Sequence, residues 1–190
     1  MDNNVALLKR TIVETNRLVD GTAEEQLGDP TPCAEWTVRD LINHLTGGST
    51  MFAISAEQGS VPDDMIAQLM GGDCLGDDFR ASFRTASDRA VAAFEAPGLM
   101  DKTLKLPFGE MPAPVALAIA AFDVATHTAD LAKATNQSPG YESIYADALA
   151  LGPNVVQPEF RQPGVFGAEQ QAASTAPASD RLLAYAGRAI

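Results

Sequence analysis

The chain has 190 residues, and its 13 basic and 25 acidic residues give a formal net charge of -12. This length fits one domain, over residues 1–190, with a hydrophobic core large enough to be stable without disulfide bonds or a structural metal. The acidic balance, with no cluster of Lys and Arg to offset it, would repel phosphate backbones and anionic membranes, so nucleic acid and membrane surfaces are excluded as expected partners.

Neither a targeting signal nor a membrane span is predicted. Charged residues interrupt the first twenty positions every few residues, which leaves no uncharged signal core. The longest apolar run, residues 111–122, is shorter than the roughly 20 residues that cross a bilayer. Two cysteines, Cys33 and Cys74, cannot form a disulfide framework and lack zinc-finger spacing. We therefore expect a cytoplasmic protein with reduced thiols.

Apolar residues at helical spacing predict four long helices. They cover residues 3–20, a stretch that begins at Thr37, residues 79–94 and residues 113–135. Thr37 and Asp40 form a capping-box pattern, with Trp36 placed to pack on Leu41, and Pro114 is allowed in the first turn of its helix. No strand pattern of comparable length occurs. The fold class is therefore predicted to be all-α, an antiparallel four-helix bundle with its core in residues 3–137.

Residues 138–190 are predicted to form a C-terminal arm on this bundle. A short helix is expected at 142–151, an extended segment at 152–178 and a closing helical turn or two at 179–187. The extended segment is too apolar for a free linker, and its apolar residues are Val155, Val156, Phe160, Val165 and Phe166.

Both histidines of the chain are predicted to face the bundle interior. Asp123 and His127 are four residues apart on the fourth helix, with Asp130 three residues further on, so the three share one face. On the second helix, His44 shares the inward side with Leu41.

A divalent cation bound by His44, Asp123 and His127 would account for these polar side chains at positions that are predicted to be buried. An unpaired buried carboxylate is costly, and Asp123 has no Lys or Arg three or four residues away on its helix. Two imidazoles and one carboxylate leave coordination positions open, and zinc or nickel suits imidazole best, although non-haem iron uses the same trio. The alternative is a pair of core histidines that are satisfied by backbone carbonyls, hydroxyls or Asp123.

Asp130 and Cys33, near these candidate ligands, each have two possible interpretations. Asp130 either accepts a hydrogen bond from a ligating imidazole or a metal-bound water, or faces solvent and pairs with Lys133. Cys33 either has its pKa lowered by the N-terminus of the second helix or is a buried loop cysteine.

Four motifs resemble one known family. They are "TPCAEWTVRDLINHLTGG", "DVATHTADLAKATNQ", "GVFGAE" and "DRLLAYAGR". Together they are similar to the DinB-like, mycothiol-dependent maleylpyruvate isomerase N-terminal superfamily, and specifically to its single-domain actinobacterial metal-binding branch.

The resemblance implies an up-down-down-up bundle with a metal at one end, held by His44, Asp123, His127 and water. It also implies transfer or isomerisation chemistry with a low-molecular-weight thiol such as mycothiol, which the metal holds as a thiolate. The isomerase itself has Glu where this chain has Asp123, and it has a separate C-terminal domain.

Three functions remain open from the sequence. The chain is a thiol-dependent transferase or isomerase with a small-molecule thiol and an electrophilic substrate, a non-catalytic metal-binding stress or sensing protein, or a dimerising helical domain without metal. The oligomeric state, monomer or homodimer, is also open.

Overall fold

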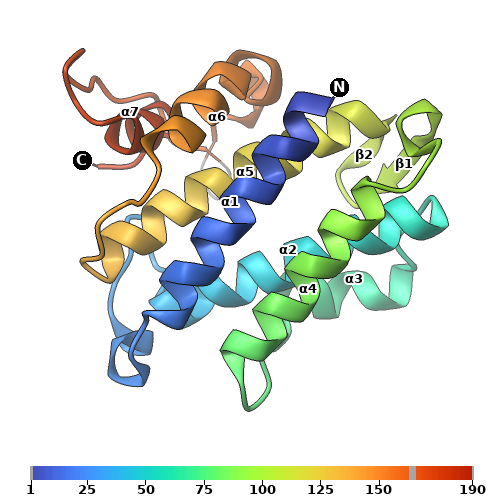
Figure 1. Cartoon of the computed structure of the whole chain (residues 1–190), viewed down its shortest axis with the longest axis horizontal. Coiled ribbons are helices and arrows are strands. Elements are labelled where there is room, and N and C mark those ends of the chain that lie inside the picture. Colours follow the sequence, from blue (N-terminus) through green and yellow to red (C-terminus); the bar gives the residue numbers. More distant parts are fainter. Residues whose placement is uncertain (1, 163–165, 190) are drawn as a thin grey trace.

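The computed structural model describes residues 2–162 and 166–189 and is mostly helical (Figure 1). The α-helices are α1 (Asp2–Asp20), α2 (Val38–Gln58), α3 (Asp63–Gly71), α4 (Phe79–Phe94), α5 (Ala113–Ala134), α6 (Glu142–Val155) and α7 (Ala178–Tyr185). Strands β1 (Thr103–Leu106) and β2 (Gly109–Pro112) form a small antiparallel hairpin. The predicted all-α class is confirmed.

Helices α1, α2, α4 and α5 form the bundle, and α1 and α5 run the same way, opposite to α2 and α4 (Figure 1). Buried hydroxyls of Thr15 on α1 and Thr128 on α5 share a hydrogen bond of 2.6 Å. Arg84, near the start of α4, pairs with Asp20 at the end of α1 at 2.7 Å, as antiparallel packing requires. The chain therefore has the up-down-down-up order that the resemblance implied.

The start of α2 is fixed by the predicted capping box. The Thr37 hydroxyl accepts from the Asp40 backbone N–H at 3.2 Å, and the Asp40 carboxylate accepts from the Thr37 N–H at 2.9 Å. Two of the four unpaired N–H groups at a helix start are satisfied in this way. This cap sets the phase of the helix that carries His44.

Helix α5 is the central element of the core. It begins at Ala113 with Pro114 in its first turn, as predicted. By length and composition it is the one helix, among the residues described, that could cross a membrane, but 78% of its most apolar window is buried inside the protein. This burial is typical of the core helix of a bundle.

The β1–β2 hairpin was not predicted. Its strands are four residues long, and only Leu104 and Leu106 alternate into the core. The hairpin is held to the end of α2, where the Ser55 hydroxyl donates to the Lys105 carbonyl at 3.1 Å. A pattern this short cannot be distinguished from a loop in the sequence.

The C-terminal arm differs in part from the prediction. Helix α6 continues to Val155 rather than ending at residue 151. Pro153 lies in its last turn, and the Val156 N–H beyond it still donates to the Gly152 carbonyl at 2.8 Å. Val155 and Val156 are buried as expected, but Phe160 is 39% exposed, so its predicted packing is wrong. Val165 lies outside the described residues.

The arm ends in a short helix, as predicted, and packs on α5. Helix α7 contacts α5 and α6. The rings of Phe166 and Tyr185 both meet the buried Phe122 ring edge-on, with centroids 5.9 and 6.3 Å away. These aromatic contacts fix the end of the chain against the core.

Replacing Thr37 by Ala should lower the free energy of unfolding by about 1 kcal/mol, because the cap is lost. The measurement is urea unfolding followed by circular dichroism. The control is Thr85→Ala, since the exposed Thr85 bonds only the Ala81 carbonyl of its own helix, and this change should stay within about 0.5 kcal/mol. Equal effects of the two substitutions would contradict the role of the cap.

The contribution of Asp40 should depend on pH. Hydrogen bonds from the Thr37 side chain and backbone lower the pKa of Asp40 in the folded protein. Its stabilisation is therefore present above the unfolded-state pKa of about 4 and is lost as the pH falls through the folded value. Unfolding of wild type and Asp40→Asn should differ most near neutral pH and converge in acid. Asp88→Asn, on an exposed face of α4, should show no such convergence.

Candidate metal centre

The antiparallel packing of α2 and α5 brings the three predicted ligands together. His44 Nε2 lies 3.5 Å from one carboxylate oxygen of Asp123, and His127 Nε2 lies 3.5 Å from the other. One ligand atom from each residue lies within 4.8 Å of the other two. Sequence analysis therefore identified three side chains that the fold places in one cluster.

The donor atoms and spacing of the cluster are compatible with a divalent cation. The Nε2 atom of His44 is buried and makes no well-formed hydrogen bond among the described residues; its neighbouring acceptor is Asp123 Oδ2, 3.5 Å away. Ligand atoms about 2.0–2.1 Å from a tetrahedral zinc lie about 3.3 Å apart. Each histidine Nε2 lies 3.5 Å from a different oxygen of Asp123, and one ligand atom from each residue lies within 4.8 Å of the other two, so the side chains would have to draw slightly closer around an ion. Two imidazoles and one carboxylate are a donor set that zinc and non-haem iron both accept.

The cluster lies at the edge of the core rather than in its centre. The side chain of His127 is 8% exposed, whereas those of His44 and Asp123 are 34% and 29% exposed. Sequence analysis placed both histidines inside, which holds fully only for His127. Parts of the His44 and Asp123 side chains are therefore in contact with solvent.

The charges in the cluster stabilise one another. Burial acts to raise the pKa of Asp123, but His127 and His44 outweigh it and hold that pKa well below its usual range. Burial acts to lower the pKa of His127, but Asp123, Asp130 and Cys33 raise it well above the ordinary value. Asp123 and His127 therefore each favour the charged form of the other.

Asp130 faces His127 and not solvent. Its carboxylate is fully buried and lies 3.0 Å from His127 Nδ1, the nitrogen that points away from Asp123. The alternative pairing with Lys133 is wrong, because Lys133 reaches Asp180 on α7 instead, at 3.3 Å. Each nitrogen of His127 thus faces a carboxylate.

Two further residues join this cluster. Arg188, in the closing motif, has its Nη2 3.2 Å from Asp130 Oδ2 and 3.2 Å from Cys33 Sγ. The Cys33 thiol donates to Asp130 Oδ2 at 3.2 Å and lies 3.7 Å from His127 Nδ1. Sequence analysis left two interpretations of Cys33 open and assigned no role to Arg188, since nothing in the local pattern shows that residues 33 and 188 meet.

The loop before α2 brings Cys33 and Trp36 to the site. The Trp36 N–H donates to the Cys33 carbonyl at 3.1 Å. Glu35, between them, has a φ of 71°, which a residue with a side chain rarely adopts. The Trp36 ring then lies 4.9 Å from the His44 ring and 5.6 Å from the His127 ring, measured between centroids. Trp36 therefore covers both imidazoles.

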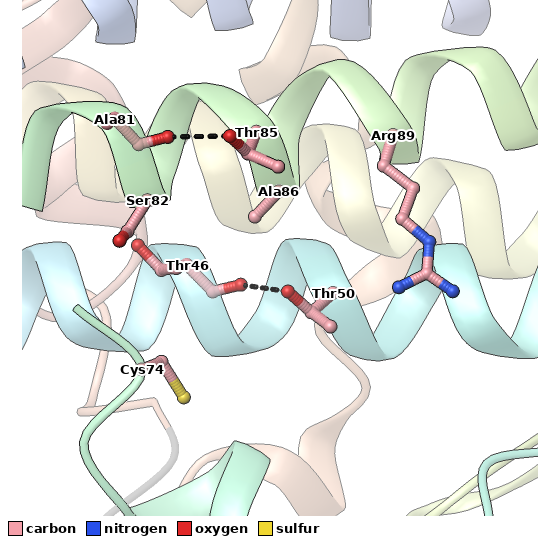
Figure 2. Close-up of a pocket in the computed structure, with 8 residues that line it drawn as sticks. All are labelled: Thr46, Thr50, Cys74, Ala81, Ser82, Thr85, Ala86 and Arg89. Atoms are coloured by element: carbon pink, nitrogen blue, oxygen red, sulfur yellow. Dashed lines mark hydrogen bonds between the residues drawn. The ribbon is translucent and has the colours of Figure 1, made fainter. Parts of the chain in front are cut away.

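A separate cavity of about 350 Å³ lies between α2 and α4 (Figure 2). Small and hydroxyl-bearing side chains line it, together with Cys74 and Arg89. Two of the hydroxyls, those of Thr50 and Thr85, donate to carbonyls of their own helices. None of the metal-cluster residues lines this cavity, so the candidate site is the half-exposed cluster.

The family model described as the mycothiol maleylpyruvate isomerase N-terminal domain matches residues 8–132. Two uncharacterized proteins of Mycobacterium tuberculosis, one from strain CDC 1551 / Oshkosh and one from strain H37Rv, are each 36% identical over 179 residues, which is 91% of this chain and 91% of theirs.

Among solved structures, the fold is similar to the crystal structure of the mycothiol-dependent maleylpyruvate isomerase, with a TM-score of 0.65 and 15% identity. A histidine-to-alanine mutant of that enzyme matches with the same TM-score and 12% identity. In both cases the match covers 85% of this chain and 69% of the other. At this level of identity the likeness concerns the fold.

The left-handed backbone conformation of Glu35, in the loop beside the site, can be tested by substitution with glycine. Glu35→Gly should raise the free energy of unfolding by about 0.5–1 kcal/mol, since removing the side chain relieves the left-handed conformation by more than the entropy that glycine costs. Ala34→Gly, at the exposed neighbouring position, should lower it by about 0.4–1 kcal/mol. Urea unfolding of both variants is the measurement, and a shift of the same sign in both would contradict the assigned conformation.

Proposed function

The chain belongs to the mycothiol maleylpyruvate isomerase N-terminal domain family, and from this premise we propose that it binds a divalent metal and uses a low-molecular-weight thiol of the mycothiol type in a transfer or isomerisation reaction. The observation that carries the proposal is the cluster of His44, Asp123 and His127, in which the buried His44 Nε2 atom makes no well-formed hydrogen bond among the described residues and lies 3.5 Å from Asp123. We further propose that the protein works in the cytoplasm.

His44, Asp123 and His127 would hold the cation, with zinc or nickel the best match to the donors. A bound divalent cation supplies a positive centre that keeps a coordinated thiol in its thiolate form near neutral pH. The half-exposed side chains of His44 and Asp123 leave the outer side of the cluster free for the thiol and its electrophilic substrate.

The surrounding residues orient the ligands. The Asp130 carboxylate would accept a hydrogen bond from His127 Nδ1–H. In a neutral imidazole the lone pair is then on Nε2, the atom that faces Asp123. Trp36 lies against both imidazole rings and limits their rotation. These contacts prepare the ligand set before the cation and the thiol bind.

Untagged wild-type protein should contain about one zinc or nickel per chain by elemental mass spectrometry, and His44→Ala, His127→Ala and Asp123→Ala should each lose it, because two ligands hold a cation far less tightly than three. The control is Asp147→Ala, which removes an exposed carboxylate that pairs with Arg10 on the surface. It should retain the metal. Metal-free wild type after reconstitution would refute the metal site.

The reaction is tested separately, with mycothiol and maleylpyruvate and with mycothiol and a general aryl halide electrophile. Metal-loaded wild type should consume the thiol or isomerise the substrate, and the ligand variants should not. Stoichiometric metal without turnover on any of these substrates would favour a non-catalytic metal-binding protein.

A further inference from the structure

We propose that Arg188 is a positioning residue for the metal centre: by holding Asp130 as the acceptor for His127 Nδ1, it directs the lone pair of His127 Nε2 toward Asp123 and His44. The inference rests on the proposed function. It assigns a role to the closing motif "DRLLAYAGR", which the metal ligands leave without one.

The contacts of Arg188 are those of a buried ion pair and not of a surface arginine. Its Nε lies 3.4 Å from both carboxylate oxygens of Asp130, and its Nη2 lies 3.2 Å from Oδ2. Arg188 is 9% exposed and Asp130 is 0% exposed. A carboxylate buried this deeply needs a positive partner, and Arg188 is a permanent cation that provides one.

The consequence for His127 follows from hydrogen-bond chemistry. A carboxylate paired with arginine can only accept hydrogen bonds, so the Nδ1 atom, 3.0 Å from Asp130 Oδ2, must carry the proton. In a neutral imidazole the lone pair is then on Nε2. Nε2 is the atom that lies 3.5 Å from Asp123 Oδ1. The contact between Arg188 and Asp130 therefore determines which nitrogen of His127 offers a lone pair to the ligand cluster.

The rest of the C-terminal segment holds Arg188 in place. Its Nη1 donates to the Ala186 carbonyl at 3.1 Å, and its backbone N–H donates to the Leu183 carbonyl at 2.9 Å. Arg161 supports the same segment by donating to the carbonyls of Gly167 and Tyr185, each at 3.0 Å. Arg161 therefore offers a matched control, because it secures the segment through Gly167 and Tyr185 and pairs with Glu169 rather than with Asp130.

The test measures zinc affinity by competition with a chromophoric chelator for wild type, Arg188→Ala, Arg188→Lys and Arg161→Ala. We expect Arg188→Ala to weaken zinc binding by about 10–100-fold, the usual effect of removing a residue that supports a metal ligand. Arg188→Lys should recover part of this loss, since lysine restores the charge but not the planar fork. Arg161→Ala should bind zinc like wild type.

A second readout does not depend on metal. In the His44→Ala background, His127 is the only histidine, so its Nδ1 proton can be followed by NMR of protein with ¹⁵N-labelled histidine. We expect slow exchange of this proton with arginine at position 188 and fast exchange in Arg188→Ala. If Arg188→Ala fails to fold, as judged by circular dichroism, Arg188→Lys supplies both readouts.

Wild-type zinc affinity in Arg188→Ala, an equal loss in Arg161→Ala, or an Nδ1 proton that is unaffected by Arg188→Ala would each overturn the proposal. Wild type that binds no zinc, while its Nδ1 proton still depends on Arg188, would refute the proposed metal function but not the orientation of His127. The two failures are therefore distinguishable.

Discussion

The buried carboxylate of Asp130 is the constraint on which the candidate site depends. It lies within α5, a core helix, and is fully inaccessible to solvent. Such a charge would cost several kcal/mol without partners. Its partners come from three separate parts of the chain: His127 from the same helix, Cys33 from the loop before α2 and Arg188 from the C-terminal segment. Satisfying one charge therefore requires that the loop, the core helix and the end of the chain meet.

These contacts fix the orientation of the His127 ring. One of its nitrogens faces Asp130 and the other faces Asp123, so the ring cannot turn over without losing both contacts. Trp36 lies against the same ring and against His44. The rigid part of the site is thus buried around His127, while the half-exposed Asp123 and His44 form its accessible side. A metal site that is to admit a small molecule needs both parts.

Sequence analysis identified the parts of the fold that local patterns specify. Thr37 and Asp40 mark the start of α2 through a cap that needs only four residues, and the spacing of Asp123 and His127 places them on one face of a helix. The β1–β2 hairpin and the contact between Cys33 and Arg188 were missed, because the hairpin is held by the end of α2 and the contact joins residues 155 positions apart. Information of this kind exists only in the packed chain.

The C-terminal segment completes the candidate site in this chain. The match to the isomerase structure covers 69% of that chain, so part of that enzyme has no counterpart in the match. In this chain the cluster is completed by its own last helix and the residues after it, through Arg188. The guanidinium of Arg188 is engaged by Asp130 and Cys33, which is the arrangement expected of a residue that orients His127 through Asp130. Under the proposed function, the thiol and its substrate would meet the cluster on its partly exposed side, where Trp36, His44 and Asp123 lie.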